Sequence, residues 1–160
     1  MKKIKFTFDV LAYESIEELS PQDLQLMHKA IVAREKAYAP YSNFNVGAAV
    51  LLKNGEVVTG ANQENAAFPA GLCAERVAVF YAGAKYPEVE ILTIAITAAS
   101  KINTTEKPAA PCGNCRQSIL EYEQKQRTPI KLLLMGEKGE VLQCNSIADI
   151  LPLGFDSSFL

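Results

Sequence analysis

The stretch "VEILTIAITA", residues 89–98, decides the fold of this chain. It is an almost continuous apolar run that is rich in β-branched residues. Such a run is typical of a strand in the middle of a sheet, where other elements cover both faces. The sequence therefore predicts a central strand here, with helices packed on its two sides.

The segments before and after this strand predict helices. Residues 73–85 and residues 112–124 both have helical periodicity. A polar loop, "SKINTTEKPAAP", separates the central strand from the second of these helices. The apolar residues on one side of the first helix are Val77, Phe80, Tyr81 and Ala84.

A third helix is predicted nearer the start of the chain, in the segment that follows "LSPQDL". Ser20 is suited to the N-cap and Pro21 to the first helical position. We expect this helix to end near Ala39, because Pro40 disfavours its continuation. Its expected buried stripe consists of Leu24, Met27, Ile31 and Tyr38.

The remaining segments predict strands. Residues 4–10 alternate apolar and polar side chains, and residues 44–62 predict a hairpin with a type I′ turn at Asn54-Gly55. "PIKLLLM" predicts another buried strand, and the short "GEKGEVLQC" then returns too quickly for a parallel crossover. Helices that alternate with buried strands indicate a three-layer α/β/α domain with a mixed sheet.

Composition and charge exclude several classes of protein. The chain has 160 residues, a net charge of −2 and 49% hydrophobic residues, which is ordinary for one globular domain. An acidic balance argues against nucleic acid as the main partner. No apolar run reaches the ~20 residues that a membrane-spanning helix needs. A cytoplasmic, reducing location is therefore the expectation, in which cysteines at motif spacing are metal ligands or reactive thiols.

Three of the four cysteines stand at the starts of predicted helices. Cys73 begins one helix, while Cys112 and Cys115 form a C-x-x-C pair at the start of another. Helix N-termini stabilise thiolates, and one helical turn can offer two sulfurs to a single zinc ion. Three protein ligands would leave a fourth coordination position open, as in catalytic zinc sites.

Two other interpretations of the cysteines stay open at this point. The C-x-x-C pair is also compatible with a redox pair, and Cys144 could complete a structural cage of four cysteines. His28, the only histidine, lies in the middle of a predicted helix and far from any motif, so we do not expect it to bind metal.

Glu75 favours the catalytic interpretation. It lies two residues after Cys73, in the first helical turn, from which a carboxylate can exchange protons with a water at the open position. Three thiolates leave a zinc site with a net negative charge. Arg76 and Arg116 follow the cysteine segments and are expected to donate hydrogen bonds to the sulfurs.

The ordered motifs resemble the zinc-dependent cytidine deaminases, in their small-subunit, homotetrameric form. The signature of these enzymes, a zinc ligand-x-Glu followed by P-C-x-x-C, stands here as Cys73-Ala74-Glu75 and Pro111–Cys115. The resemblance also includes "AYAPYSNFNVGAA", "GANQENAAFPAGLCAER" and "LPLGF", and spans roughly residues 37–155. It implies the cytidine deaminase fold with a five-stranded mixed sheet, in a catalytic domain of residues 21–160 after an extension of residues 1–20.

The resemblance implies one Zn²⁺ per subunit and the hydrolysis of cytidine and 2′-deoxycytidine to uridine and 2′-deoxyuridine, with release of ammonia, in pyrimidine salvage. Glu75 would carry protons to N3 and to the departing amino group. Asn62 and Glu64 would bind the ribose 3′-OH, and Phe44 would pack near the base and the sugar. The backbones of Ala66 and Ala74 would contact the ribose and the base. Phe155 of an adjacent subunit would stack on the pyrimidine.

Some positions depart from the family pattern. Phe68 stands where many relatives have a tyrosine, Asn114 replaces a small residue, and residues 1–20 have no clear counterpart in shorter members. These residues are expected to add an edge strand or an arm that crosses to a neighbour. The alternatives to a cytidine deaminase are a deaminase of a related cytosine nucleoside, such as a nucleoside antibiotic, and a structural zinc module.

Overall fold

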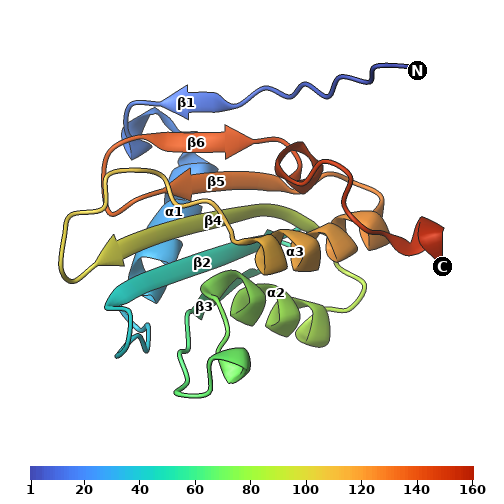
Figure 1. Cartoon of the computed structure of the whole chain (residues 1–160). Helices are drawn as coiled ribbons and strands as arrows, with labels where there is room; N and C mark the ends of the chain where they lie inside the picture. The colour runs from blue at the N-terminus through green and yellow to red at the C-terminus, as the bar shows by residue number, and fades with distance from the viewer.

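The computed structural model describes residues 1–160 and has one six-stranded sheet with helices on both faces (Figure 1). The strand order is β1-β6-β5-β4-β2-β3. Only β4 and β5 are parallel, and all other neighbours are antiparallel. The strands are β1 (Leu11–Tyr13), β2 (Phe44–Leu52), β3 (Val57–Ala61), β4 (Ile91–Ser100), β5 (Lys131–Met135) and β6 (Val141–Cys144).

Three α-helices complete the layers. Helix α1 (Pro21–Arg34) covers one face of the sheet, and α2 (Ala74–Lys85) and α3 (Gly113–Gln126) lie side by side on the other (Figure 1). An apolar cluster fills the space on each face of the sheet. The predicted three-layer α/β/α domain with a mixed sheet and a central β4 is therefore confirmed.

Helices α2 and α3 begin at the same end of the sheet because of the direction of the strands that follow them. Each helix is followed by a strand, β4 or β5, and these two strands run parallel. A helix packed against the sheet returns the chain to the start of the next strand, so both helices run the same way. Their N-termini are neighbours in Figure 1.

The sheet contains one strand more than the five expected. Residues 4–10 were expected to form a strand, but they are extended without strand pairing, and only Leu11–Tyr13 pairs with β6. This prediction was therefore wrong in its boundaries, although the segment does extend the sheet at its edge. The segment before Leu11 lies outside the sheet and runs past the end of β6 (Figure 1).

Helix α1 begins as predicted but ends five residues early. The Ser20 side chain accepts a hydrogen bond from the Asp23 amide, and Pro21 is the first helical residue. The helix ends at Arg34 because Tyr38 pairs with the segment at Gln63, where its amide donates to Asn62. The buried residues of α1 are Asp23, Leu26, Met27, Ala30 and Ala33, so of the expected stripe only Met27 is fully buried.

Helix α2 meets the sheet with a side other than the apolar one noted in the sequence. It packs on the sheet through Ala74, Ala78, Val79 and Ala82, whereas Phe80 and Tyr81 are exposed. Gly60 of β3 explains this choice: a Cβ there would lie 2.6 Å from the backbone of both Ala74 and Ala78. Helix and strand approach too closely for large side chains, so α2 turns its alanines inward.

The β2–β3 hairpin forms where predicted, with a different turn. A type I′ turn needs positive φ at both central residues, but here Gly55 has φ 86° and Asn54 is not in the positive region. The Gly55 amide donates to Leu52 and the Leu52 amide donates to Glu56. Three residues therefore form the loop, and glycine occupies the left-handed position.

Candidate metal centre and adjoining pocket

The three cysteines predicted to bind metal come together at the N-termini of α2 and α3. Cys73 is the N-cap of α2, Cys112 is the N-cap of α3, and Cys115 lies in the first turn of α3. Their sulfur atoms all lie within 4.8 Å of one another. Cys115 is buried, Cys73 is half-buried and Cys112 is exposed, so the cluster is reached from solvent on one side.

The spacing of the sulfur atoms fits a single zinc ion. Cys73 Sγ lies 3.9 Å from Cys112 Sγ, and Cys112 Sγ lies 3.5 Å from Cys115 Sγ. Ligands at a Zn–S distance of ~2.3 Å in a tetrahedron have sulfur atoms about 3.8 Å apart. All four cysteines are free, so no disulfide competes for these thiols.

Thiolate character is favoured at Cys73. Contact with the Cys115 thiol, helped by the Arg76 guanidinium and Cys112, lowers the pKa of Cys73 to about 5. Since a thiolate is the form that binds metal, the arrangement prepares Cys73 as a ligand. The contact with Cys73 and burial raise the pKa of Cys115.

Two buried polar atoms beside the cluster have no partner within the protein. Glu75 is only 4% exposed, and its Oε2 makes no hydrogen bond. Arg76 Nε is likewise buried and unpaired. Burial raises the pKa of Glu75, and the Cys73 charge raises it further. Unpaired buried polar groups are rare in proteins and point to a ligand that completes them.

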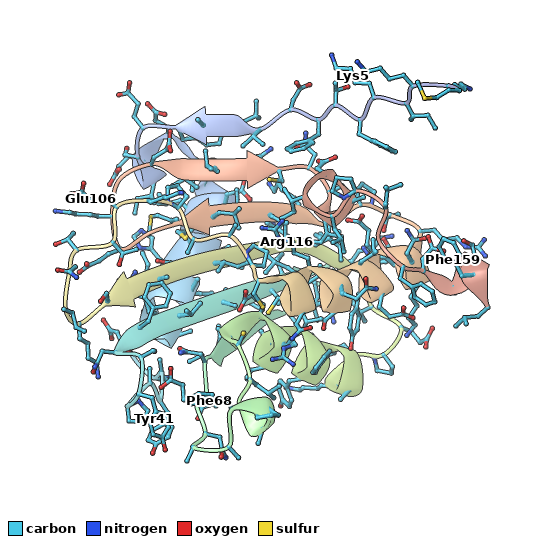
Figure 2. All side chains as sticks on the ribbon, viewed as in Figure 1. Lys5, Tyr41, Phe68, Glu106, Arg116 and Phe159 are labelled. Atoms are coloured by element: carbon cyan, nitrogen blue, oxygen red, sulfur yellow. The ribbon has the colours of Figure 1, made fainter.

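Arg116 differs from what was expected. Its Nε donates to the Pro111 carbonyl at 2.8 Å, and its Nη1 donates to the Ile150 carbonyl at 2.7 Å. No hydrogen bond joins it to a sulfur atom. It therefore holds the backbone just before Cys112 against the segment at Ile150, in the middle of the molecule (Figure 2).

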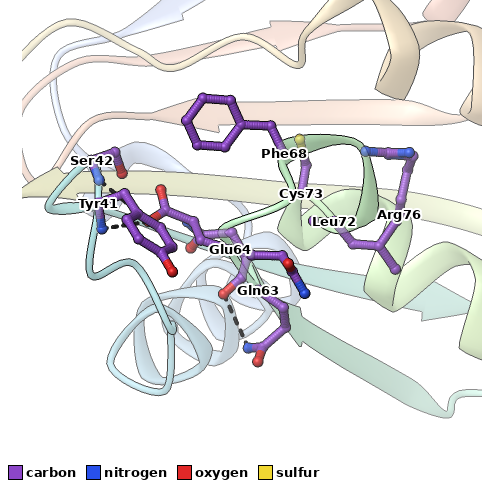
Figure 3. A pocket seen from close by; sticks show the side chains of 11 residues that line it. Tyr41, Ser42, Gln63, Glu64, Phe68, Leu72, Cys73 and Arg76 are labelled. Carbon is purple, nitrogen blue, oxygen red and sulfur yellow. Dashed lines mark hydrogen bonds between the residues drawn. The ribbon is translucent and has the colours of Figure 1, made fainter.

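A pocket of about 500 Å³ adjoins the cysteine cluster (Figure 3). It brings four predicted site residues together: Asn62, Glu64, Cys73 and Arg76. The residues that complete its lining are Tyr41, Ser42, Gln63, Asn65, Phe68, Gly71 and Leu72. The volume is suited to a small polar ligand rather than a polymer.

Glu64 and Asn62 are held by hydrogen bonds from loop and strand backbone. Glu64 Oε2 accepts from the amides of Tyr41 and Ser42 at 2.9 and 3.3 Å (Figure 3). Hydrogen bonding by Ser42 and by the Tyr41 amide lowers the pKa of Glu64. Asn62 Oδ1 accepts from the Val46 amide at 2.8 Å, and its Nδ2 donates to the Phe44 carbonyl at 2.9 Å.

The other four residues predicted to bind the substrate do not line this pocket. Phe44 is 36% exposed at the start of β2, Ala74 is buried at the start of α2, and Ala66 is exposed in the loop between β3 and α2. Phe155 is stacked on Phe159, with ring centroids 5.3 Å apart. The exposed Phe159 lies at the opposite side of Figure 2 from Tyr41 and Phe68.

The sequence reasoning missed Tyr41. Its ring meets the Phe68 ring edge to face, with centroids 6.5 Å apart, and the two aromatic side chains form one wall of the pocket. Tyr41 lies 23 residues before Glu64, to which its amide donates. The signal was its place in the "APYSNF" segment, beside Phe44.

The structural cage of four cysteines is not formed. Cys144 is buried in β6 and does not belong to the group of three thiols that can share an ion. His28 is exposed on α1 and also lies outside this group.

Comparison with known proteins identifies relatives of the whole fold. Residues 20–129 match the family model of the cytidine and deoxycytidylate deaminase zinc-binding region. A cytidine deaminase of Halalkalibacterium halodurans is 39% identical over 130 residues, which are 81% of this chain and 91% of that protein. One of Sporosarcina psychrophila is 36% identical over 136 residues, covering 85% of this chain and 93% of that one.

A solved structure gives the same result. The crystal structure of a cytidine deaminase from Burkholderia pseudomallei superposes with a TM-score of 0.72 at 38% identity. The match covers 86% of this chain and 100% of that one. Its whole length is therefore contained in the fold described above, while part of this chain has no counterpart there.

Proposed function

Because this chain belongs to the cytidine and deoxycytidylate deaminase family, we propose that it hydrolyses cytidine and 2′-deoxycytidine to uridine and 2′-deoxyuridine, with release of ammonia. This is a reaction of pyrimidine salvage. One observation carries the proposal: the unpaired Oε2 of Glu75 is buried beside three thiols that can share a metal ion, next to a pocket of about 500 Å³.

Cys73, Cys112 and Cys115 would hold one zinc ion per subunit. The bound ion would supply Lewis acidity, which makes water a nucleophile near neutral pH. Arg76 stands next to Cys73, where its positive charge offsets part of the thiolate charge. The positive ends of two helix dipoles act in the same sense, because all three ligands lie at helix N-termini.

Glu75 holds and moves the proton. Its raised pKa makes it a stronger base than an exposed carboxylate, and its buried position excludes bulk water from the transfer. It takes one proton from the attacking water at Oε2 and delivers it to N3, and it then moves the remaining proton of the new C4 hydroxyl to the leaving amino group. Ammonia then departs from C4, and the ring is left as uracil.

The residues in and around the pocket bind the base and the ribose of the nucleoside. We assign the ribose 3′-OH to Glu64 and Asn62, because Glu64 keeps one oxygen free of protein hydrogen bonds and both residues line the pocket. The backbones of Ala66 and Ala74 are assigned to the ribose and the base. Phe44 is assigned to the base and sugar, in a position that the Asn62 hydrogen bond to its carbonyl fixes.

We assign Phe155 to a neighbouring subunit's pocket, in a homotetramer. Phe155 is 55% exposed and lines no pocket near the cysteines of its own chain. Helix α2 supplies an interface, since Phe80 and Tyr81 are 42% and 55% exposed on a helix that begins at the metal centre. An exposed apolar helix face of this kind is typical of subunit contacts.

We also propose the domain limits and the location. The family match begins at residue 20, which supports an extension of residues 1–20 before a catalytic domain of residues 21–160. None of the helices is long and apolar enough to cross a membrane. Four free cysteines, three of them needed as thiolates, support a reducing compartment such as the cytoplasm.

The proposal is tested by incubating zinc-loaded protein with cytidine and following uridine and ammonia. We expect stoichiometric formation of both products, loss of turnover with a chelator, and recovery when zinc is returned. A nucleoside antibiotic containing cytosine serves as the alternative substrate. Turnover of that compound without turnover of cytidine would show that the substrate assignment is wrong.

A further inference from the structure

Residues 1–10 form an arm that the rest of the chain leaves uncovered. The arm runs outward from β1, and Lys5 lies well away from the body of the molecule (Figure 2). No residue of the arm belongs to a helix or a strand, and none takes part in the backbone hydrogen bonds formed outside these elements. An extended segment with unpaired backbone groups is a ready template for another strand.

The side chains of the arm are sorted by face. In an extended chain, alternate residues point to opposite sides, so one side carries Ile4, Phe6, Phe8 and Val10, and the other carries Lys3, Lys5, Thr7 and Asp9. The four apolar side chains are 68%, 57%, 49% and 39% exposed. Apolar alternation of this regularity is what a strand with one buried face requires.

A groove of about 360 Å³ lies beside the arm. Phe6 and Phe8 line one part of it, and Leu120 of α3 with Leu151 and Leu153 of the chain end line another. Leu153 is 85% exposed and has a φ of 61°, which is uncommon for leucine. Phe6, Phe8 and Leu153 therefore present exposed apolar side chains at the groove, from the two ends of the sequence, above the buried Leu120.

Charge favours a second copy of the same chain as the occupant. The arm holds three of the 16 basic residues and one of the 18 acidic residues, so its formal charge is +2 and that of the remaining residues is −4. Asp149 and Asp156 line the groove. An incoming arm thus brings net positive charge to a groove that carries two carboxylates, and phenylalanines to leucines.

We propose that the arms of two copies cross, so that each arm lies in the groove of the other copy. Each groove is lined in part by the arm of its own chain, so an incoming arm lies beside that arm. The two arms then run antiparallel about a two-fold axis. Such pairing satisfies the free backbone groups of both arms and joins two sheets at their β1 edges. The family match begins only at residue 20, so this contact adds to whatever interface the catalytic domain forms.

The first test compares the self-association of four forms of the full-length protein by sedimentation equilibrium. These are the wild type, a form lacking residues 2–10, the variant Phe6→Ser/Phe8→Ser, and the variant Asp9→Ala, on the opposite face of the arm and outside the lining of the groove. The deletion and the phenylalanine variant should weaken the association at this interface by about tenfold or more. The variant of the opposite face should remain within about twofold of the wild type. Equal association constants for all four forms would overturn the proposal.

The second test identifies which copy the arm touches. Chains with ¹⁴N and ¹⁵N are refolded together and treated with a lysine-reactive cross-linker, and the peptides of Lys3 and Lys5 are analysed by mass. Mixed-isotope pairs involving these lysines are expected.

If the arm peptides pair only within one isotope, the arm lies in the groove of its own chain and the crossing is wrong. If the arm remains unprotected in hydrogen exchange as well, it is free or awaits a different protein, which also contradicts the proposal. Deaminase activity is measured in parallel, so failure here is distinguishable from failure of the proposed function.

Discussion

Glu75 is a carboxylate that the fold buries without giving one of its oxygens a partner. If it moves protons during deamination, Glu75→Gln should lower turnover of cytidine by about 10²–10⁴-fold, the usual range for an acid–base group. Zinc content, measured by metal analysis, should stay at one ion per chain. Glu121→Gln, on the exposed side of α3, is the matched control and should keep wild-type turnover. Full turnover of the Glu75 variant would exclude the proposed role.

Asn62 supports Phe44 as well as facing the pocket. Its side chain bonds the backbone of β2 at both Phe44 and Val46. Asn62→Ala should therefore lower the free energy of unfolding by about 1–3 kcal/mol, because two backbone groups lose their partner. It should also raise KM for cytidine. Urea unfolding and steady-state kinetics measure the two effects, and Asn103→Ala, an exposed asparagine in the loop after β4, is the control for both. An unchanged unfolding midpoint would mean that water replaces the side chain.

The individual residues that sequence predicted best are those whose partners are close in sequence. Cys112, Cys115 and the pair Cys73 and Glu75 each act within one helical turn, so local spacing sufficed to propose them. Arg116 was placed wrongly because one of its partners, Ile150, is 34 residues away and is brought near only by the complete fold. Tyr41 was missed for the same reason.

The contact between α2 and β3 depends on a residue without a side chain. A Cβ on Gly60 would meet the backbone of α2 at Ala74 and Ala78, which cannot rotate away. Gly60→Ala should therefore push the helix outward, lower stability by about 1–3 kcal/mol, and weaken zinc binding through Cys73. Thermal unfolding and zinc titration measure these effects. Gly113→Ala, where a Cβ meets nothing within 4 Å, should bind zinc like the wild type. Equal zinc affinity of both variants would show that α2 tolerates the displacement.

Element positions followed from the sequence more readily than element faces. Turn residues and apolar periods located every α-helix and every strand from α1 onward, whereas the apolar side noted for α2 is not the side that meets the sheet. Periodicity marks an apolar stripe, but it does not say whether the stripe meets the sheet or another molecule. The end of α1 was also wrong, since Tyr38 leaves the helix in order to pair near Gln63, and no local signal encodes that pairing.

The metal centre joins two helices that belong to different parts of the chain. Zinc bound to the folded state should stabilise it, by about 2.7 kcal/mol at a free concentration of 100 times Kd. Removal by a chelator should accordingly lower Tm by several degrees, and added zinc should restore it. Cys115→Ser should have the Tm of the chelator-treated wild type, with or without added zinc. The Tm of Cys144→Ser should still rise when zinc is added. Loss of zinc from the Cys144 variant would instead support a four-cysteine cage.

The exposed face of α2 gives a prediction for the whole assembly. Phe80→Ser/Tyr81→Ser should reduce the mass measured by light scattering below that of a tetramer, because it removes two large apolar side chains from the proposed interface. Val32→Ser, at an equally exposed apolar position of α1, should leave the mass unchanged. A tetramer that persists in both variants would place the interface elsewhere.

The architecture of the molecule was predictable because the alternation of helices and buried strands leaves few arrangements. Residues 1–20 were expected to add an edge strand or an arm, but the place of the strand at Leu11–Tyr13 was not predicted, since three paired residues are too few to produce a pattern of their own. The conspicuous alternation lies just before them, in a segment that the body of the chain does not cover.

The shared starting edge of α2 and α3 has a consequence for how this enzyme can be altered. The cysteines meet because two strands point the same way, and the length of the link from β4 to α3 has no part in it. Lys101–Thr104 of that link are exposed, while Thr105 is bonded to the amide of Glu137. A peptide tag or a fluorophore attached at Ile102 would thus extend into solvent, and its size would not disturb the metal centre.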